Sequence, residues 1–61
     1  MPIVRIDLFK GRTREQKAKV AKEITDLIQR DLGVPPDQTL VIFNDIEKSD
    51  WAVAGKLSDG G

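Results

Sequence analysis

The sequence contains no cysteine and no histidine. Without cysteine there is no disulfide framework and no thiol nucleophile, and without histidine there is no imidazole base. The usual ligand sets for zinc and haem are therefore missing as well. No run of about 18 apolar residues is present, and the first residues do not resemble a signal peptide. We expect a soluble, cytoplasmic protein with no membrane span.

The chain is also short, because 61 residues form at most one small domain, residues 1–61. A domain of this size buries only about 60% of the surface that its unfolded chain exposes, which makes it marginal as a monomer. Small domains gain stability from disulfides, metals or self-association. Because the sequence has no cysteine for disulfides and none of the usual metal-ligand sets, self-association is the expected source of stability.

Charge is balanced overall but unevenly distributed, with ten basic and ten acidic side chains. Residues 10–22 hold six cations against one anion, whereas residues from 31 onward hold two lysines against six acids. A basic segment can indicate nucleic-acid binding, but this one lacks interleaved aromatic residues. A solvated helix face is the favoured interpretation, and a weak field that attracts small anions is the alternative. We expect no nucleic-acid partner.

Hydrophobic periodicity predicts two strands and one long helix. Residues 2–9 and 38–46 carry apolar side chains on both alternating faces, which is typical of strands. Residues 14–32 carry an apolar stripe at steps of three and four. Thr13 and Gln16 form a capping-box pattern before this helix, and Gly33 suits its carboxyl end.

This order predicts an α+β fold with a right-handed β-α-β crossover and two parallel strands. One helix covers only one face of such a sheet, so we expect the opposite apolar face to be covered by another subunit. The tail from Glu47 is predicted to form a short hairpin or an arm that docks on a neighbouring chain, with a frayed end.

Pro2 follows Met1, and its small side chain allows an aminopeptidase to remove Met1. Removal would leave the secondary amine of Pro2 at the amino terminus. A free α-amine titrates near pH 8, close enough to neutrality to act as a base. An apolar pocket and nearby cations would lower its pKa, and Val4, Leu8, Trp51 and Arg12 are candidates for that environment. The alternative is that Pro2 only permits removal of Met1.

Three segments resemble the 4-oxalocrotonate tautomerase family: Pro2-Ile3, GRTREQK at 11–17 and WAVAGKL at 51–57. The resemblance extends over essentially the whole chain. It implies the tautomerase fold, with dimers that form a four-stranded sheet and assemble as a homohexamer, a trimer of dimers. It also implies a cofactor-independent isomerase that moves a proton in small anionic 2-hydroxydienoates such as 2-hydroxymuconate, chemistry that belongs to the degradation of aromatic compounds.

The same resemblance implies roles for four residues. Pro2 is the expected general base and acid, and Arg12 is expected to bind a substrate carboxylate. Trp51 occupies the position of an apolar aromatic wall, with a plain subunit-interface anchor as the alternative. Leu40 stands where better-studied members have a second arginine, contributed by another subunit, so one cationic contact is missing.

Two alternatives to this function remain at the level of sequence. One is a hydratase or dehalogenase that acts on unsaturated acids, which would need a carboxylate to activate water, and Asp7 is a poor candidate for that role. The other is a non-catalytic or complementing subunit of a hetero-oligomer, an interpretation that Leu40 favours and Pro2, Arg12 and Trp51 oppose.

Overall fold

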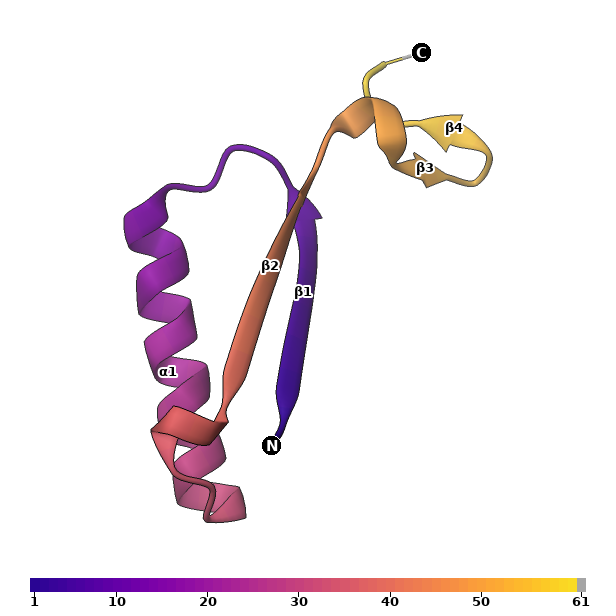
Figure 1. Ribbon diagram of the computed structural model, residues 1–61. Coiled ribbons are helices and arrows are strands. Elements are labelled where there is room, and N and C mark those ends of the chain that lie inside the picture. Colours follow the sequence, from indigo (N-terminus) through magenta and orange to yellow (C-terminus); the bar gives the residue numbers. More distant parts are fainter. Residues whose placement is uncertain (61) are drawn as a thin grey trace.

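The computed structural model describes residues 1–60, so only the last residue of the predicted domain lies outside it. A parallel two-stranded sheet, β1 (Ile3–Phe9) with β2 (Leu40–Ile46), is joined by the helix α1 (Arg14–Leu32). A short antiparallel hairpin follows, β3 (Ala52–Val53) with β4 (Lys56–Leu57). Figure 1 shows α1 along one side of the sheet and the hairpin at the end opposite the amino terminus. The predicted β-α-β unit and hairpin are confirmed.

Helix α1 has the bounds that the sequence predicted. The Thr13 hydroxyl accepts a hydrogen bond from the Gln16 N–H at 3.1 Å, and the Gln16 side-chain oxygen accepts one from the Thr13 N–H at 2.9 Å. These reciprocal bonds satisfy two donors that the first helical turn leaves free. At the other end Gly33 adopts a left-handed conformation, φ 70°, and donates its N–H to the Gln29 carbonyl.

Strand β2 starts later than predicted, at Leu40 instead of residue 38. Residues Pro36–Gln38 form a single 3₁₀ turn, in which the Gln38 N–H donates to the Pro35 carbonyl at 3.0 Å. The Thr39 N–H donates to the Pro36 carbonyl in the same turn. Because these two donors are used locally, the sheet ladder begins only after them.

The two faces of the sheet are covered unequally. Val4 lies beside Val41 and Ile6 beside Phe43 on the side of α1, and all four are half-buried. The opposite face is open and carries the remaining residues of both strands: Ile3, Arg5, Asp7 and Phe9 of β1 with Leu40, Ile42, Asn44 and Ile46 of β2. The open apolar face that the sequence predicted is therefore present.

No side chain in the described chain is fully buried. The radius of gyration is 14.7 Å, whereas a compact domain of this length has about 10 to 11 Å. The accessible surface is 4800 Å², against about 4,000 Å² for a compact monomer of this mass. The chain by itself thus leaves its apolar surface uncovered. No helix among residues 1–60 has the length and apolar character needed to cross a membrane.

The helix cap yields a stability prediction. Thr13→Ala removes the hydroxyl acceptor of the Gln16 N–H, so the free energy of unfolding should fall by about 1 kcal/mol. Thermal denaturation at fixed protein concentration measures the effect. Thr25→Ala is the matched control, because the Thr25 hydroxyl donates to the Ala21 carbonyl inside the helix and caps nothing. Equal losses in both variants would contradict a special role for the cap.

Candidate functional site

Pro2 and Leu40 lie together at the amino-terminal end of the sheet. The Pro2 carbonyl accepts a hydrogen bond from the Leu40 N–H at 3.0 Å, which ties the residue before β1 to the first residue of β2. Pro2 is half-buried, and Leu40 is 44% exposed. The position where the family resemblance implies an arginine thus holds a leucine, whose backbone is bonded to that of the candidate base and whose side chain lies on the open face with Ile3.

Thr39 adds a feature at this end that sequence reasoning missed. Its hydroxyl oxygen is buried, yet it has no hydrogen-bond partner in the described chain. A buried hydroxyl without a partner is uncommon in proteins. The one signal in the sequence is the position of Thr39, which directly precedes Leu40 and follows the Pro35-Pro36 pair.

Arg12 lies at the other end of β1. It follows the turn at Gly11, whose φ of 128° suits glycine, and it precedes the Thr13 cap of α1. The seven residues of β1 separate it from Pro2, and at about 3.3 Å each they span more than about 20 Å. The described chain therefore does not bring its own Pro2 and Arg12 together, as the positions of the amino terminus and the first loop in Figure 1 show.

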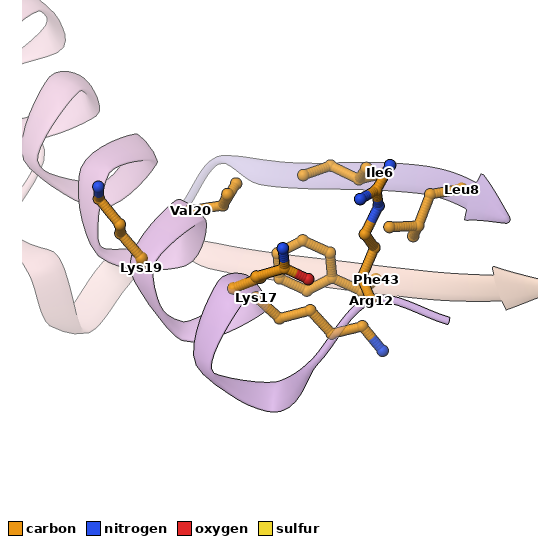
Figure 2. Close-up of a pocket in the computed structure, with 8 residues that line it drawn as sticks. Ile6, Leu8, Arg12, Lys17, Lys19, Val20 and Phe43 are labelled. Carbon is orange, nitrogen blue, oxygen red and sulfur yellow. The ribbon is translucent and has the colours of Figure 1, made fainter. Parts of the chain in front are cut away.

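A cavity of about 390 Å³ lies between α1 and the sheet near Arg12. Its apolar lining consists of Ile6, Leu8, Val20 and Phe43, and its polar lining of Arg12, Gln16, Lys17 and Lys19. Figure 2 shows the Arg12 side chain running toward β1, where Ile6 and Leu8 lie. The cavity thus combines an apolar surface with cations, which suits an amphiphilic anion.

Of the three cations that line this cavity, only Lys17 has an ion-pair partner within the described chain. The Lys17 ammonium is paired with the Asp45 carboxylate at 2.6 Å, so its charge is largely compensated. Arg12 and Lys19 make no ion pair within the described chain. A planar guanidinium matches a carboxylate through two parallel hydrogen bonds, which an ammonium does not. Arg12 is therefore the better candidate for binding a carboxylate.

Trp51 lies against Phe9, with ring centroids 4.4 Å apart and ring planes tilted by 53°. The Lys48 ammonium lies 5.7 Å from the centroid of the Phe9 ring, within the range of a cation–π contact. Phe9 belongs to the open face, so this aromatic pair lies at the same end of β1 as Arg12 but outside the cavity. Sequence reasoning assigned Trp51 and missed Phe9, although Phe9 shares the alternating pattern of Ile3.

Lys10 holds the tail segment at this end of the sheet. Its ammonium is paired with the Glu47 carboxylate at 3.0 Å, and its N–H donates to the Ile46 carbonyl. The hydrogen bond with Glu47 and the negative charge of that group raise the pKa of Lys10 above its ordinary value of 10.5. Lys10 is therefore a cation throughout the neutral range, close in sequence to Arg12.

The candidate residues thus fall into two groups at opposite ends of one strand. Pro2 and Leu40 form the first group, and Arg12 with the Phe9–Trp51 pair forms the second. Of the pocket residues expected around Pro2, the structure places Leu8 and Arg12 on the cavity and Trp51 on Phe9. A base and a carboxylate-binding group can act on one small molecule only if both lie close to it, so Pro2 of one chain would have to lie near Arg12 of another.

Comparison with known proteins finds tautomerases that match nearly the whole chain. A family model described as tautomerase enzyme matches residues 2–59. A probable tautomerase of Ralstonia nicotianae is 49% identical over 57 residues, which cover 93% of this chain and 88% of that protein.

Solved structures agree in fold. The crystal structure of a 4-oxalocrotonate tautomerase homologue is 28% identical with a TM-score of 0.93, covering 100% of this chain and 97% of that one. A heterohexamer 4-oxalocrotonate tautomerase from Chloroflexus aurantiacus is 27% identical with a TM-score of 0.87, covering 97% and 95%. The predicted fold and family resemblance are confirmed by these similarities.

Proposed function

This chain belongs to the tautomerase family and is a tautomerase-like isomerase, and we propose that it interconverts enol and keto forms of small anionic 2-hydroxydienoates such as 2-hydroxymuconate. The observation that carries the proposal is the position of Pro2. The family match begins at this residue, and its backbone is held at the start of the sheet by the 3.0 Å bond from Leu40.

In the proposed reaction Pro2 acts first as base and then as acid. The secondary amine takes the proton of the enol hydroxyl, and the electrons of that O–H bond form the carbonyl while the conjugated double bonds shift. The resulting ammonium returns a proton to the distant carbon of the system. The proton count is unchanged, so no oxidant, reductant or cofactor enters the balance.

This chemistry requires the removal of Met1. While Met1 is attached, the Pro2 nitrogen is an amide and has no basic lone pair. Met1 is 79% exposed, which makes its peptide bond to Pro2 accessible to an aminopeptidase. After removal, the ring and the strand restrict the direction of the lone pair, which lowers the ordering that the reaction needs.

We assign the substrate carboxylate to Arg12 of a second chain, because Arg12 and Pro2 of one chain lie at opposite ends of β1. A guanidinium forms a bidentate contact with a carboxylate and also stabilises charge that develops on the dienolate. The proposed assembly is a homohexamer built as a trimer of dimers. The uncovered apolar surface of the single chain supports assembly with further copies.

Leu40 and Trp51 set the apolar part of the proposed site. Leu40 provides no charge for a second carboxylate, so we expect either slow turnover of dicarboxylates such as 2-hydroxymuconate or a preference for a substrate with an apolar far end. The Trp51 ring, packed on Phe9, would exclude water from the site that the second chain completes. In the assembled site both residues would make the surroundings of the amine apolar, which favours its neutral form.

A second candidate is a complementing subunit of a hetero-oligomeric tautomerase. Leu40 favours it, because a partner chain with a cationic residue would supply the contact that this chain lacks. The similar protein from Chloroflexus aurantiacus is described as a heterohexamer. Native mass spectrometry of protein from its own cells separates the two, since a homohexamer contains one subunit mass and a hetero-oligomer contains two.

Pro2→Ala should lower turnover of 2-hydroxymuconate by about 10² to 10⁴, because it removes the secondary amine that transfers the proton. Alanine also permits removal of Met1, so both proteins begin at residue 2, which intact-mass measurement verifies. Pro36→Ala is the control, since Pro36 lies in the 3₁₀ turn before β2. Full turnover in Pro2→Ala would refute the proposed role of the amine.

Leu40→Arg should improve kcat/KM for a dicarboxylate dienol more than for a monocarboxylate enol such as phenylenolpyruvate, by about tenfold or more. The physical reason is a new charge-assisted contact from a neighbouring chain to the second carboxylate of the substrate. Leu57→Arg is the matched control, because Leu57 is 46% exposed, close to the 44% of Leu40, and lies in β4. An equal gain on both substrates would show that Leu40 does not determine this preference.

Mixing inactive variants tests whether Pro2 and Arg12 act from different chains. Pro2→Ala and Arg12→Ala chains, refolded together in equal amounts, should recover about a quarter of wild-type activity, since half of the chains keep Pro2 and about half of those meet a chain with an intact Arg12. Each variant refolded alone is the control. Activity that stays at the level of the separate variants would place both residues in one chain's site.

A further inference from the structure

Thr39 carries a hydroxyl that the fold does not use. Its oxygen is buried and has no hydrogen-bond partner within residues 1–60. On burial such a group loses its hydrogen bonds to water and gains none in return, which is unfavourable. Groups of this kind are rare in native proteins, and each one calls for a partner that the local fold does not supply.

The backbone keeps this hydroxyl in place. The Thr39 N–H donates to the Pro36 carbonyl at 3.2 Å, and the residue is extended, with φ −108° and ψ 125°. Threonine is β-branched, so its χ1 angle is restricted. The hydroxyl is therefore held at the start of β2 and does not turn freely toward solvent.

Pro2 is the neighbour of Thr39 on the adjacent strand. The 3.0 Å bond from the Leu40 N–H continues the parallel ladder to the Pro2 carbonyl, which sets Pro2 beside Thr39. Val4 lies beside Val41 on the side of α1. Because side chains alternate along a strand, the residues two positions earlier, Pro2 and Thr39, lie on that side as well, and both are half-buried. Figure 1 shows the amino terminus and the turn into β2 at the same end of the sheet.

The polar groups around this core are already bonded or lie at the surface. The Thr25 hydroxyl, on the half-buried face of α1, donates to the Ala21 carbonyl at 2.8 Å. The Lys17 ammonium on the same face is paired with Asp45. The charged group nearest to Thr39 along the chain is the Asp37 carboxylate of the 3₁₀ turn, and it is exposed. The remaining half-buried residues of α1 are the apolar Ala21, Ile24 and Ile28.

Removal of Met1 creates a donor beside this unpaired acceptor. While Met1 is attached, the Pro2 nitrogen carries no hydrogen. The free amine carries one N–H when neutral and two when protonated. We propose that the Thr39 hydroxyl accepts a hydrogen bond from the Pro2 nitrogen of the processed chain, directly or through one water molecule, and thereby directs the lone pair of the amine.

This bond makes Thr39 a positioning residue. A neutral proline amine has one N–H and one lone pair, and inversion at nitrogen exchanges their positions. An acceptor for the N–H fixes the lone pair on the other side of the nitrogen, away from Thr39, where it is free to take the proton of the substrate. After that transfer one N–H of the ammonium stays on Thr39, and the other is returned to the substrate. The positioning role rests on the proposed function, whereas the bond itself does not.

Nitrogen NMR on processed protein with isotope-labelled proline tests the bond without substrate. The chain has three prolines, and only the nitrogen of Pro2 titrates, so one resonance moves with pH. A hydroxyl that accepts from the ammonium favours the charged form. Thr39→Val removes the hydroxyl and keeps the branched shape, so it should lower the midpoint of this titration by about 0.5 to 1 in pH. Thr39→Ser keeps the hydroxyl and should retain the wild-type midpoint.

Thr25→Val is the matched control, because it removes a hydroxyl of α1 that is bonded to the Ala21 carbonyl, and it should leave the midpoint unchanged. An unchanged or higher midpoint in Thr39→Val, or an equal fall in Thr25→Val, would overturn the proposed bond.

Stability with and without Met1 gives a second measurement, since a chain of 61 residues can be synthesised in both forms. With Met1 the hydroxyl has no partner, so Thr39→Val should not lower the melting temperature. Without Met1 the same change removes the bond to Pro2 and, at equal protein concentration, should lower the melting temperature by about 4 to 8 °C. Effects of equal size in both forms would assign the hydroxyl a purely structural role and reject the proposal.

The catalytic consequence is measured separately. Thr39→Val should lower kcat for 2-hydroxymuconate by about tenfold with little change in KM, because the lone pair is no longer directed while Arg12 still binds the carboxylate. The acid limb of the pH–rate profile should move together with the NMR midpoint. Full turnover with an unchanged midpoint would refute the bond alone. A bond shown by NMR in a protein that turns over no enol would refute the proposed function and leave the bond standing.

Discussion

The chain has more apolar sheet surface than its one long helix can cover, and the rest of the structure depends on this constraint. Both faces of the β1–β2 sheet carry apolar side chains, yet the chain has one long helix, and that helix covers one face. No described side chain is fully buried as a result. Hydrophobic burial is the dominant favourable term in folding. The stability of this fold must therefore come largely from surfaces that only other chains can cover.

Strand β1 also determines how the active site has to be built. An extended strand is stiff, so Pro2 and Arg12 are held apart by its length and no side-chain motion brings them together. A site that uses both residues needs two chains. Under the proposed function, assembly and activity are then coupled, because contacts that cover the apolar surface also place the base beside the carboxylate-binding group.

The helix bounds and the parallel pairing of the two strands were predictable from the sequence, whereas individual side-chain contacts between distant residues were not. The capping box at Thr13 and the left-handed Gly33 specify the helix bounds because their hydrogen bonds are formed within a few residues. The predicted start of the second strand at residue 38 was wrong, because a 3₁₀ turn uses the N–H groups of Gln38 and Thr39 and β2 starts only at Leu40. The packing of Trp51 on Phe9 joins residues 42 positions apart, and neither periodicity nor spacing specifies such a contact. Family resemblance supplied the expected roles of Pro2 and Arg12, but not the distance between them in one chain.

Leu40 affects the two requirements of the proposed site in different ways. A base that works near neutrality must be uncharged, and an apolar neighbour disfavours the ammonium form by desolvation, much as a nearby cation does by repulsion. Under the proposed function, leucine in place of arginine adds apolar surface to the site that further chains complete, which favours the neutral amine. What leucine cannot do is bind a second carboxylate or stabilise charge that develops on the substrate. The departure at Leu40 thus bears on which substrate is preferred more than on whether the amine can act as a base.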